Sequence, residues 1–129
     1  MQGMIVTHNH PYKEEQNGNK NLTQISTKDL QLAYKCRMYE LRLVNGLYVH
    51  SFSWSADANE NHVQLLCESI KTLVAEIKTN MYKAKNRGLV IHAHQEGTHK
   101  IINLMKNSEQ KFKYNYTLRR RKIWKNQED

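Results

Sequence analysis

Two histidines near the start of the chain, His8 and His10, have a spacing that suits metal binding. The preceding run Met4-Ile5-Val6-Thr7 is typical of a β-strand, and residues two apart in a strand point to the same side. Neutral imidazole is a favoured zinc ligand, and a carboxylate can complete a site of three protein ligands with water in the fourth position. Asp29 is the candidate carboxylate, because it falls in the first turn of a predicted helix, where exposed backbone amides stabilise a negative charge.

Ser26 lies one turn before Asp29 and is the candidate catalytic residue, because its hydroxyl could hydrogen-bond a metal-bound water or a substrate carbonyl. The same residues have simpler interpretations. Asparagine and proline are ordinary turn residues, so residues 8–11 also fit a polar turn. Ser26 with Asp29 also fits a capping pair at the start of a helix.

Residues 8–11, HNHP, followed by residues 26–29, STKD, resemble the HxHP…SxxD signature of JAMM metalloproteases, which have the JAB/MPN fold. The form with asparagine between the histidines resembles the module at the C-terminus of phage head-morphogenesis (MuF-like minor head) proteins. The resemblance covers residues 5–54 in order and is one of pattern only beyond them. It implies Zn²⁺ bound by His8, His10 and Asp29, an oxyanion role for Ser26, and a phage or prophage protein that acts in head assembly with other phage or host proteins.

This chain departs from the family pattern in two ways. The family carries a glutamate on an upstream strand as general base for the zinc-bound water, whereas none of the seven residues before His8 is acidic. The stretch of fourteen residues between Pro11 and Ser26 is also longer than is usual in the family. We therefore expect a zinc-binding module that is truncated or degenerate as a metallopeptidase, or one whose base comes from another protein.

The densest basic run is at the C-terminus. Cationic side chains of this kind bind phosphates without reading sequence, and Tyr116 or Trp124 could stack on bases. A solvated tail is the alternative interpretation. The run supports a second hypothesis of function: a small basic nucleic-acid-binding or protein-interaction protein with a dead remnant of the metal motif. The candidate phosphate-binding residues are Arg119, Arg120, Arg121, Lys122 and Lys125.

Other residues with chemical potential have structural interpretations. His92, His94 and His99 fall in a predicted helix, where their spacings do not share one face, so a polar helix face is favoured over a second metal cluster. Cys36 and Cys67 lie in helical patterns and are expected to be buried, reduced thiols.

The predicted elements define one mixed α/β (α+β) domain. A strand at residues 4–7 precedes a helix that starts after Ser26, with a flexible loop between them. Alternation over residues 39–43, the turn Asn45-Gly46 and residues 47–54 predict a β-hairpin. Apolar residues at helical spacing predict a long helix over residues 59–85, whose stripe from Val63 to Met81 is core or an oligomer interface. A helical stretch interrupted at Gly97 spans residues 89–107, and a strand starts at Phe112.

Composition restricts the class of protein. With 129 residues, 39% hydrophobic and 25% charged, the chain fits one globular domain over residues 1–118 with a basic tail over residues 119–129. No apolar run approaches a membrane span. The resemblance to phage head-morphogenesis modules implies a protein of the host cytoplasm or the virion. The net charge of +8 favours a partner rich in phosphate or carboxylate.

Overall fold

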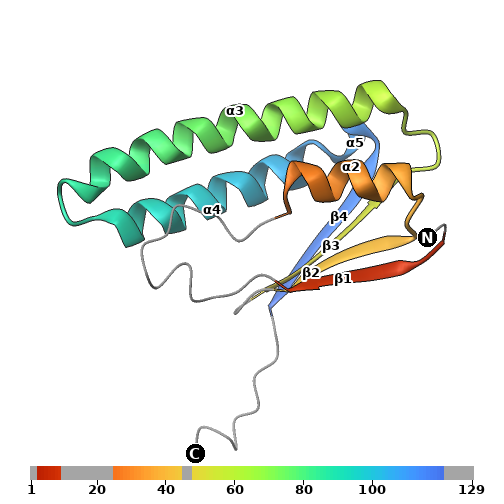
Figure 1. The fold of residues 1–129 in the computed structure, drawn as a ribbon, viewed down its shortest axis with the longest axis horizontal. Coiled ribbons are helices and arrows are strands. Elements are labelled where there is room, and N and C mark those ends of the chain that lie inside the picture. Colours follow the sequence, from red (N-terminus) through yellow and green to blue (C-terminus); the bar gives the residue numbers. More distant parts are fainter. Residues whose placement is uncertain (1–2, 10–24, 45–47, 121–129) are drawn as a thin grey trace, which may run out of the picture.

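The computed structural model of the chain describes residues 3–9, 25–44 and 48–120 (Figure 1). Within this part the chain forms a four-stranded mixed sheet and four helices, which confirms the predicted α/β class. The elements follow in the order β1 (Ile5–Asn9), α2 (Thr27–Lys35), β2 (Glu40–Val44), β3 (Tyr48–Trp54), α3 (Glu60–Lys85), α4 (Val90–Asn107), α5 (Glu109–Phe112) and β4 (Tyr114–Arg120).

The sheet has the strand order β1-β2-β3-β4. β1 and β2 are parallel and are connected through α2, which is the usual way for a chain to return to the same end of a sheet. β2 and β3 form the predicted hairpin, although the Asn45-Gly46 turn lies outside the described residues, and β4 adds antiparallel to β3. The helices lie on one face of the sheet (Figure 1). The other face carries polar side chains, as is common in sheets with one solvated face. One row of them crosses all four strands: Thr7, Arg42, Ser51 and Thr117.

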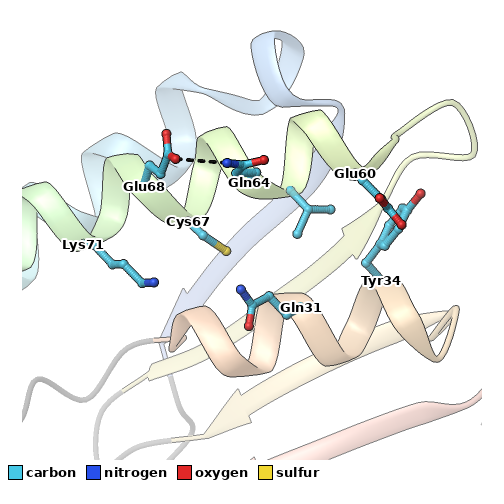
Figure 2. A pocket seen from close by; sticks show the side chains of 8 residues that line it. Gln31, Tyr34, Glu60, Gln64, Cys67, Glu68 and Lys71 are labelled. Carbon is cyan, nitrogen blue, oxygen red and sulfur yellow. Dashed lines mark hydrogen bonds between the residues drawn. The ribbon is translucent and has the colours of Figure 1, made fainter.

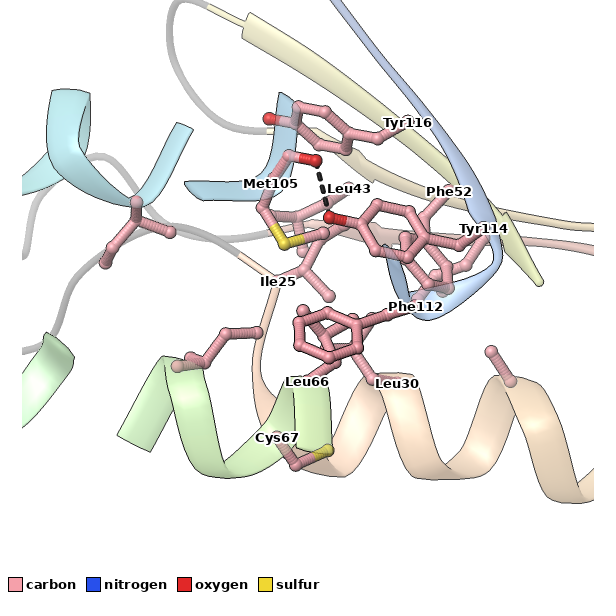
Figure 3. Close-up of a cluster of buried hydrophobic side chains, with 14 of the residues drawn as sticks. Ile25, Leu30, Leu43, Phe52, Leu66, Cys67, Met105, Phe112, Tyr114 and Tyr116 are labelled. Atoms are coloured by element: carbon pink, nitrogen blue, oxygen red, sulfur yellow. Dashed lines mark hydrogen bonds between the residues drawn. The ribbon is translucent and has the colours of Figure 1, made fainter. Parts of the chain in front are cut away.

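The core lies between the sheet and the helices (Figure 3). Leu41 and Leu43 alternate with outward-facing residues along β2 and are buried, and they pack with Phe52 of β3. The predicted stripe of α3 forms the helical side of this core, through Val63, Leu66, Cys67, Ile70, Ile77 and Met81. The stripe is therefore covered by the chain's own sheet and helices.

Helix boundaries follow local capping signals. Asn59 caps α3 by accepting a hydrogen bond from the His62 backbone N–H, and the His62 ring accepts one from the Asn59 backbone N–H. α3 ends before Gly88, whose φ of +72° is in the left-handed region that glycine adopts without strain. The predicted long helix is thus confirmed to within one residue at its start.

Three details of the sequence prediction are wrong. α4 is not interrupted at Gly97, because this glycine is buried inside a continuous helix that packs on α3. Phe112 belongs to α5 rather than to the last strand, since the chain turns at Lys113, which has a φ of +61°. The predicted strand over residues 39–43 starts one residue too early, because Tyr39 precedes β2 and is exposed.

Candidate metal centre

The first candidate ligand, His8, lies next to the last residue of strand β1. Its Cα pairs with Leu43 of β2, and Leu43 in turn pairs with His50 of β3. His8, Leu43 and His50 are therefore successive residues of one row across the sheet. The side chain of His8 and the whole of His10 lie outside the described part of the structure.

The candidate carboxylate lies at the same end of the sheet. β1 and β2 run in the same direction, so the connecting helix α2 runs back between them and begins near the end of β1 (Figure 1). Ser26 and Asp29 occupy the start of this helix. The crossover thus brings residues that are separated by about twenty positions in the sequence to one end of the fold.

Ser26 and Asp29 form a complete capping box. The Ser26 Oγ accepts a hydrogen bond from the Asp29 backbone N–H over 3.1 Å, and the Asp29 Oδ2 accepts one from the Ser26 backbone N–H over 3.3 Å. This confirms the capping interpretation of the pair. The side chain of Asp29 is held in a fixed orientation and the residue is only 8% exposed. Hydrogen bonds of this kind also orient carboxylates that bind metals, so capping and ligation are compatible roles.

A buried histidine that the sequence analysis did not single out lies on the core side of β3. His50 is 1% exposed, and its Nδ1 lies 2.7 Å from the hydroxyl oxygen of Tyr116 on β4. Burial raises the pKa of Tyr116 above its ordinary value, so the hydroxyl stays protonated. The available signal was the alternation of β3, which places His50 on the same face as Phe52.

The expected stacking role of Tyr116 is wrong. Its ring is buried against the core and faces His50, with ring centroids 5.9 Å apart, so it offers no surface to a base. Tyr114 is buried in the same way and donates a hydrogen bond to the backbone carbonyl of Met105 (Figure 3). The two tyrosines therefore connect β4 to the core and to α4.

No group of three histidine, cysteine, aspartate or glutamate side chains within the described residues is placed to hold a metal ion. The proposed ligand set includes His10 and the side chain of His8, which are not among them. The prediction of zinc at His8, His10 and Asp29 therefore stays a prediction.

The histidines of α4 do not form a second cluster. His92 Nε2 lies 3.1 Å from Oε1 of Glu96, one helical turn later. His99 is exposed, as expected for a polar helix face. His94 differs from that expectation because it is buried. Its Nε2 has no hydrogen-bond partner in the part of the chain that the structure describes.

A groove of about 440 Å³ between α2 and α3 contains the thiol of Cys67 (Figure 2). Gln31, Tyr34 and Lys71 also line it. Burial raises the pKa of the Cys67 thiol, and the nearby positive charge of Lys71 offsets only part of this effect. A thiol of raised pKa is a poor nucleophile, so the groove lacks the property of a cysteine active site. Both cysteines are free, and Cys36 is only partly buried.

The structure describes only the first two residues of the basic run. Arg119 and Arg120 belong to β4 and are exposed, whereas Arg121, Lys122 and Lys125 lie beyond the described residues. Arg119 is on the open face of the sheet, near an ion pair in which Arg42 Nε lies 2.6 Å from Glu40 Oε2. The hydrogen bond from Arg42 lowers the pKa of Glu40, and Arg119 adds to this effect.

None of the helices that the structure describes is long and apolar enough to cross a bilayer. No protein-family model, curated protein or solved structure matches this chain.

Proposed function

We propose that the chain is a JAMM-like zinc-binding module whose ligands are His8, His10 and Asp29. The observation that supports this most directly is the crossover from β1 through α2 to β2. It brings the end of the strand that carries His8 and the start of the helix that carries the buried Asp29 to one end of the sheet. Strand ends and helix starts in α/β folds are common positions for ligand-binding residues.

The chemistry proposed for the site is binding and polarisation of one oxygen ligand. Zinc with three protein ligands keeps a fourth position for water or a substrate oxygen, and lowers the pKa of a bound water. Hydrolysis also needs a base that accepts the proton of that water. No acidic residue precedes His8 in this chain, so we propose that the chain alone binds zinc without peptidase activity.

The setting follows from the resemblance to phage head-morphogenesis modules. We propose that the module acts in a phage or prophage protein during head assembly, with phage or host proteins as partners. A partner that supplies a carboxylate near the zinc would complete the hydrolytic site.

Zinc content of the purified chain tests the proposal. We expect about one equivalent per chain, lost in His8→Ala and His10→Ala and weakened in Asp29→Asn. Asp29→Asn also weakens a helix cap, so the matched control is Asn59→Ala, which removes the cap of α3. The control should retain zinc. A wild-type chain that takes up no zinc after dialysis against it would contradict the proposal.

A second candidate function is non-specific nucleic-acid binding through the end of β4. The observation that favours it is the exposure of Arg119 and Arg120 where β4 leads into the remaining basic run. Because both residues pair with β3, deleting them would also damage the sheet. The better test replaces Arg119 and Arg120 by Gln and separately removes residues 121–129. Each change should weaken DNA binding and reduce its salt dependence, and unchanged gel-shift titrations would reject this function.

A further inference from the structure

The tip of the α3–α4 hairpin, residues 82–91, exposes large apolar side chains at one end of the molecule. Tyr82 is 64% exposed, Leu89 51% and Ile91 60%. The two helices extend past the ends of the strands, so the tip stands at the extremity of the fold (Figure 1). These three exposed residues lie within ten positions of one another, which makes the tip a candidate contact surface.

The same tip is strongly cationic. Lys83, Lys85 and Arg87 are exposed, and the sequence contains no acidic residue between Glu76 and Glu96. None of these three cations makes an ion pair with a residue that the structure describes. The tip therefore combines unneutralised positive charge with exposed apolar surface.

We propose that the hairpin tip binds the surface of an anionic lipid bilayer. Lysine and arginine side chains reach lipid phosphates, while neighbouring apolar and aromatic side chains enter the boundary between headgroups and acyl chains. Leu89 and Ile91 supply the apolar side chains, and Tyr82 supplies an amphipathic ring of the kind that favours this boundary. Lys83, Lys85 and Arg87 supply the attraction to anionic headgroups.

Charge and exposed apolar surface disfavour the other occupants. A second copy of the chain would bring two cationic tips, each on a chain of net charge +8, against each other. Nucleic acid would neutralise the cations but would leave Leu89 and Ile91 without an apolar partner.

Vesicle co-sedimentation of the full chain tests the proposal, with phosphatidylcholine alone compared with a mixture rich in phosphatidylglycerol. The decisive variant is Leu89→Ser with Ile91→Ser, because it changes no charge. We expect wild-type chain to bind the anionic vesicles, and the double variant to bind about tenfold more weakly. The matched control is Leu32→Ser with Leu65→Ser, which removes two exposed leucines far from the tip, somewhat less exposed than Leu89 and Ile91, and should bind as wild type does.

Charge variants complete the test. Replacing Lys83, Lys85 and Arg87 by Gln should weaken binding about fivefold per cation. The same change at Lys35, Lys71 and Lys106, which are exposed elsewhere, should have a smaller effect. Equal binding by the Leu89/Ile91 variant and wild type would overturn the proposal. The protein would then bind anionic vesicles through its overall positive charge and not through the tip. Binding of the tip to DNA or to an acidic protein, with none to vesicles, would overturn it too.

Discussion

Gly97 of α4 packs directly against Ile77 of α3, and a Cβ at position 97 would overlap the Ile77 Cγ2. The absence of a side chain at Gly97 thus sets how closely the two long helices approach. A glycine normally weakens a helix, and this contact gives the physical reason for its place inside α4. The same two helices carry the hairpin tip with Leu89 and Ile91.

Gly97→Ala should therefore destabilise the protein, by about 1–3 kcal/mol from overpacking. Helix propensity alone would give the opposite sign, since alanine is favoured over glycine by about 1 kcal/mol. Urea unfolding distinguishes the two effects. In the background of Ile77→Ala, which removes the overlapping atom, Gly97→Ala should become neutral or stabilising. A stabilised single variant would show that the helices separate without cost.

Removing the Ser26 cap should lower stability without removing zinc. Ser26→Ala leaves the Asp29 backbone N–H without its acceptor, which costs about 1 kcal/mol. Asp29 itself is retained, so zinc stoichiometry should stay at the wild-type value. Denaturant unfolding and metal analysis on the same preparation measure the two quantities. Loss of zinc together with the cap would mean that Ser26 is needed to orient the ligand.

The buried tyrosines should make the protein sensitive to alkali. Burial raises the pKa of Tyr114 and Tyr116 in the folded state, whereas tyrosines of the unfolded chain ionise near pH 10. Above about pH 10 the unfolded state therefore loses protons first, and the free energy of unfolding falls as pH rises. Urea midpoints measured from pH 8 to 11 should decline, and more shallowly in Tyr116→Phe. A flat profile in wild type would contradict this linkage.

Tyr116→Phe should also cost stability at neutral pH. The substitution removes the hydroxyl that lies 2.7 Å from His50 Nδ1 and keeps the ring. Loss of a buried hydrogen bond costs about 1 kcal/mol. Tyr39→Phe, at an exposed tyrosine, is the control and should have little effect. Equal stability of both variants would show that the His50–Tyr116 contact contributes nothing net.

The two thiols should differ in reactivity. Cys67 is buried and its thiol pKa is raised, whereas Cys36 is only partly buried. Alkylation at neutral pH, followed by mass spectrometry, should label Cys36 first, because the thiolate is the reacting form. Cys67 should react at a comparable rate only in denaturant. Equal rates in the native protein would place Cys67 in a more open environment than the structure shows.

Local patterns determined most of the secondary structure of this chain. The period of apolar residues from Val63 to Met81 predicted α3 to within one residue at its start, since this signal arises within a few turns of helix. Asn45-Gly46 between two β-type runs predicted the pairing of β2 with β3, because neighbouring strands need only a short turn to meet. The order HNHP then SxxD was visible as a motif, and the capping box that Ser26 and Asp29 form at the start of α2 followed from their spacing.

Contacts between distant segments decided the rest. The parallel pairing of β1 with β2 brings His8 and Asp29 to one end of the fold, and no local signal specifies which strand β1 joins. Burial of His50 beside Tyr116 depends on β4 pairing with β3 across more than sixty residues. Gly97 stays helical because Ile77, twenty residues earlier, fills the space beside it. Local propensity is worth at most about 1 kcal/mol per residue, and packing against a distant partner is worth several times more, so the tertiary contact prevails where the two conflict.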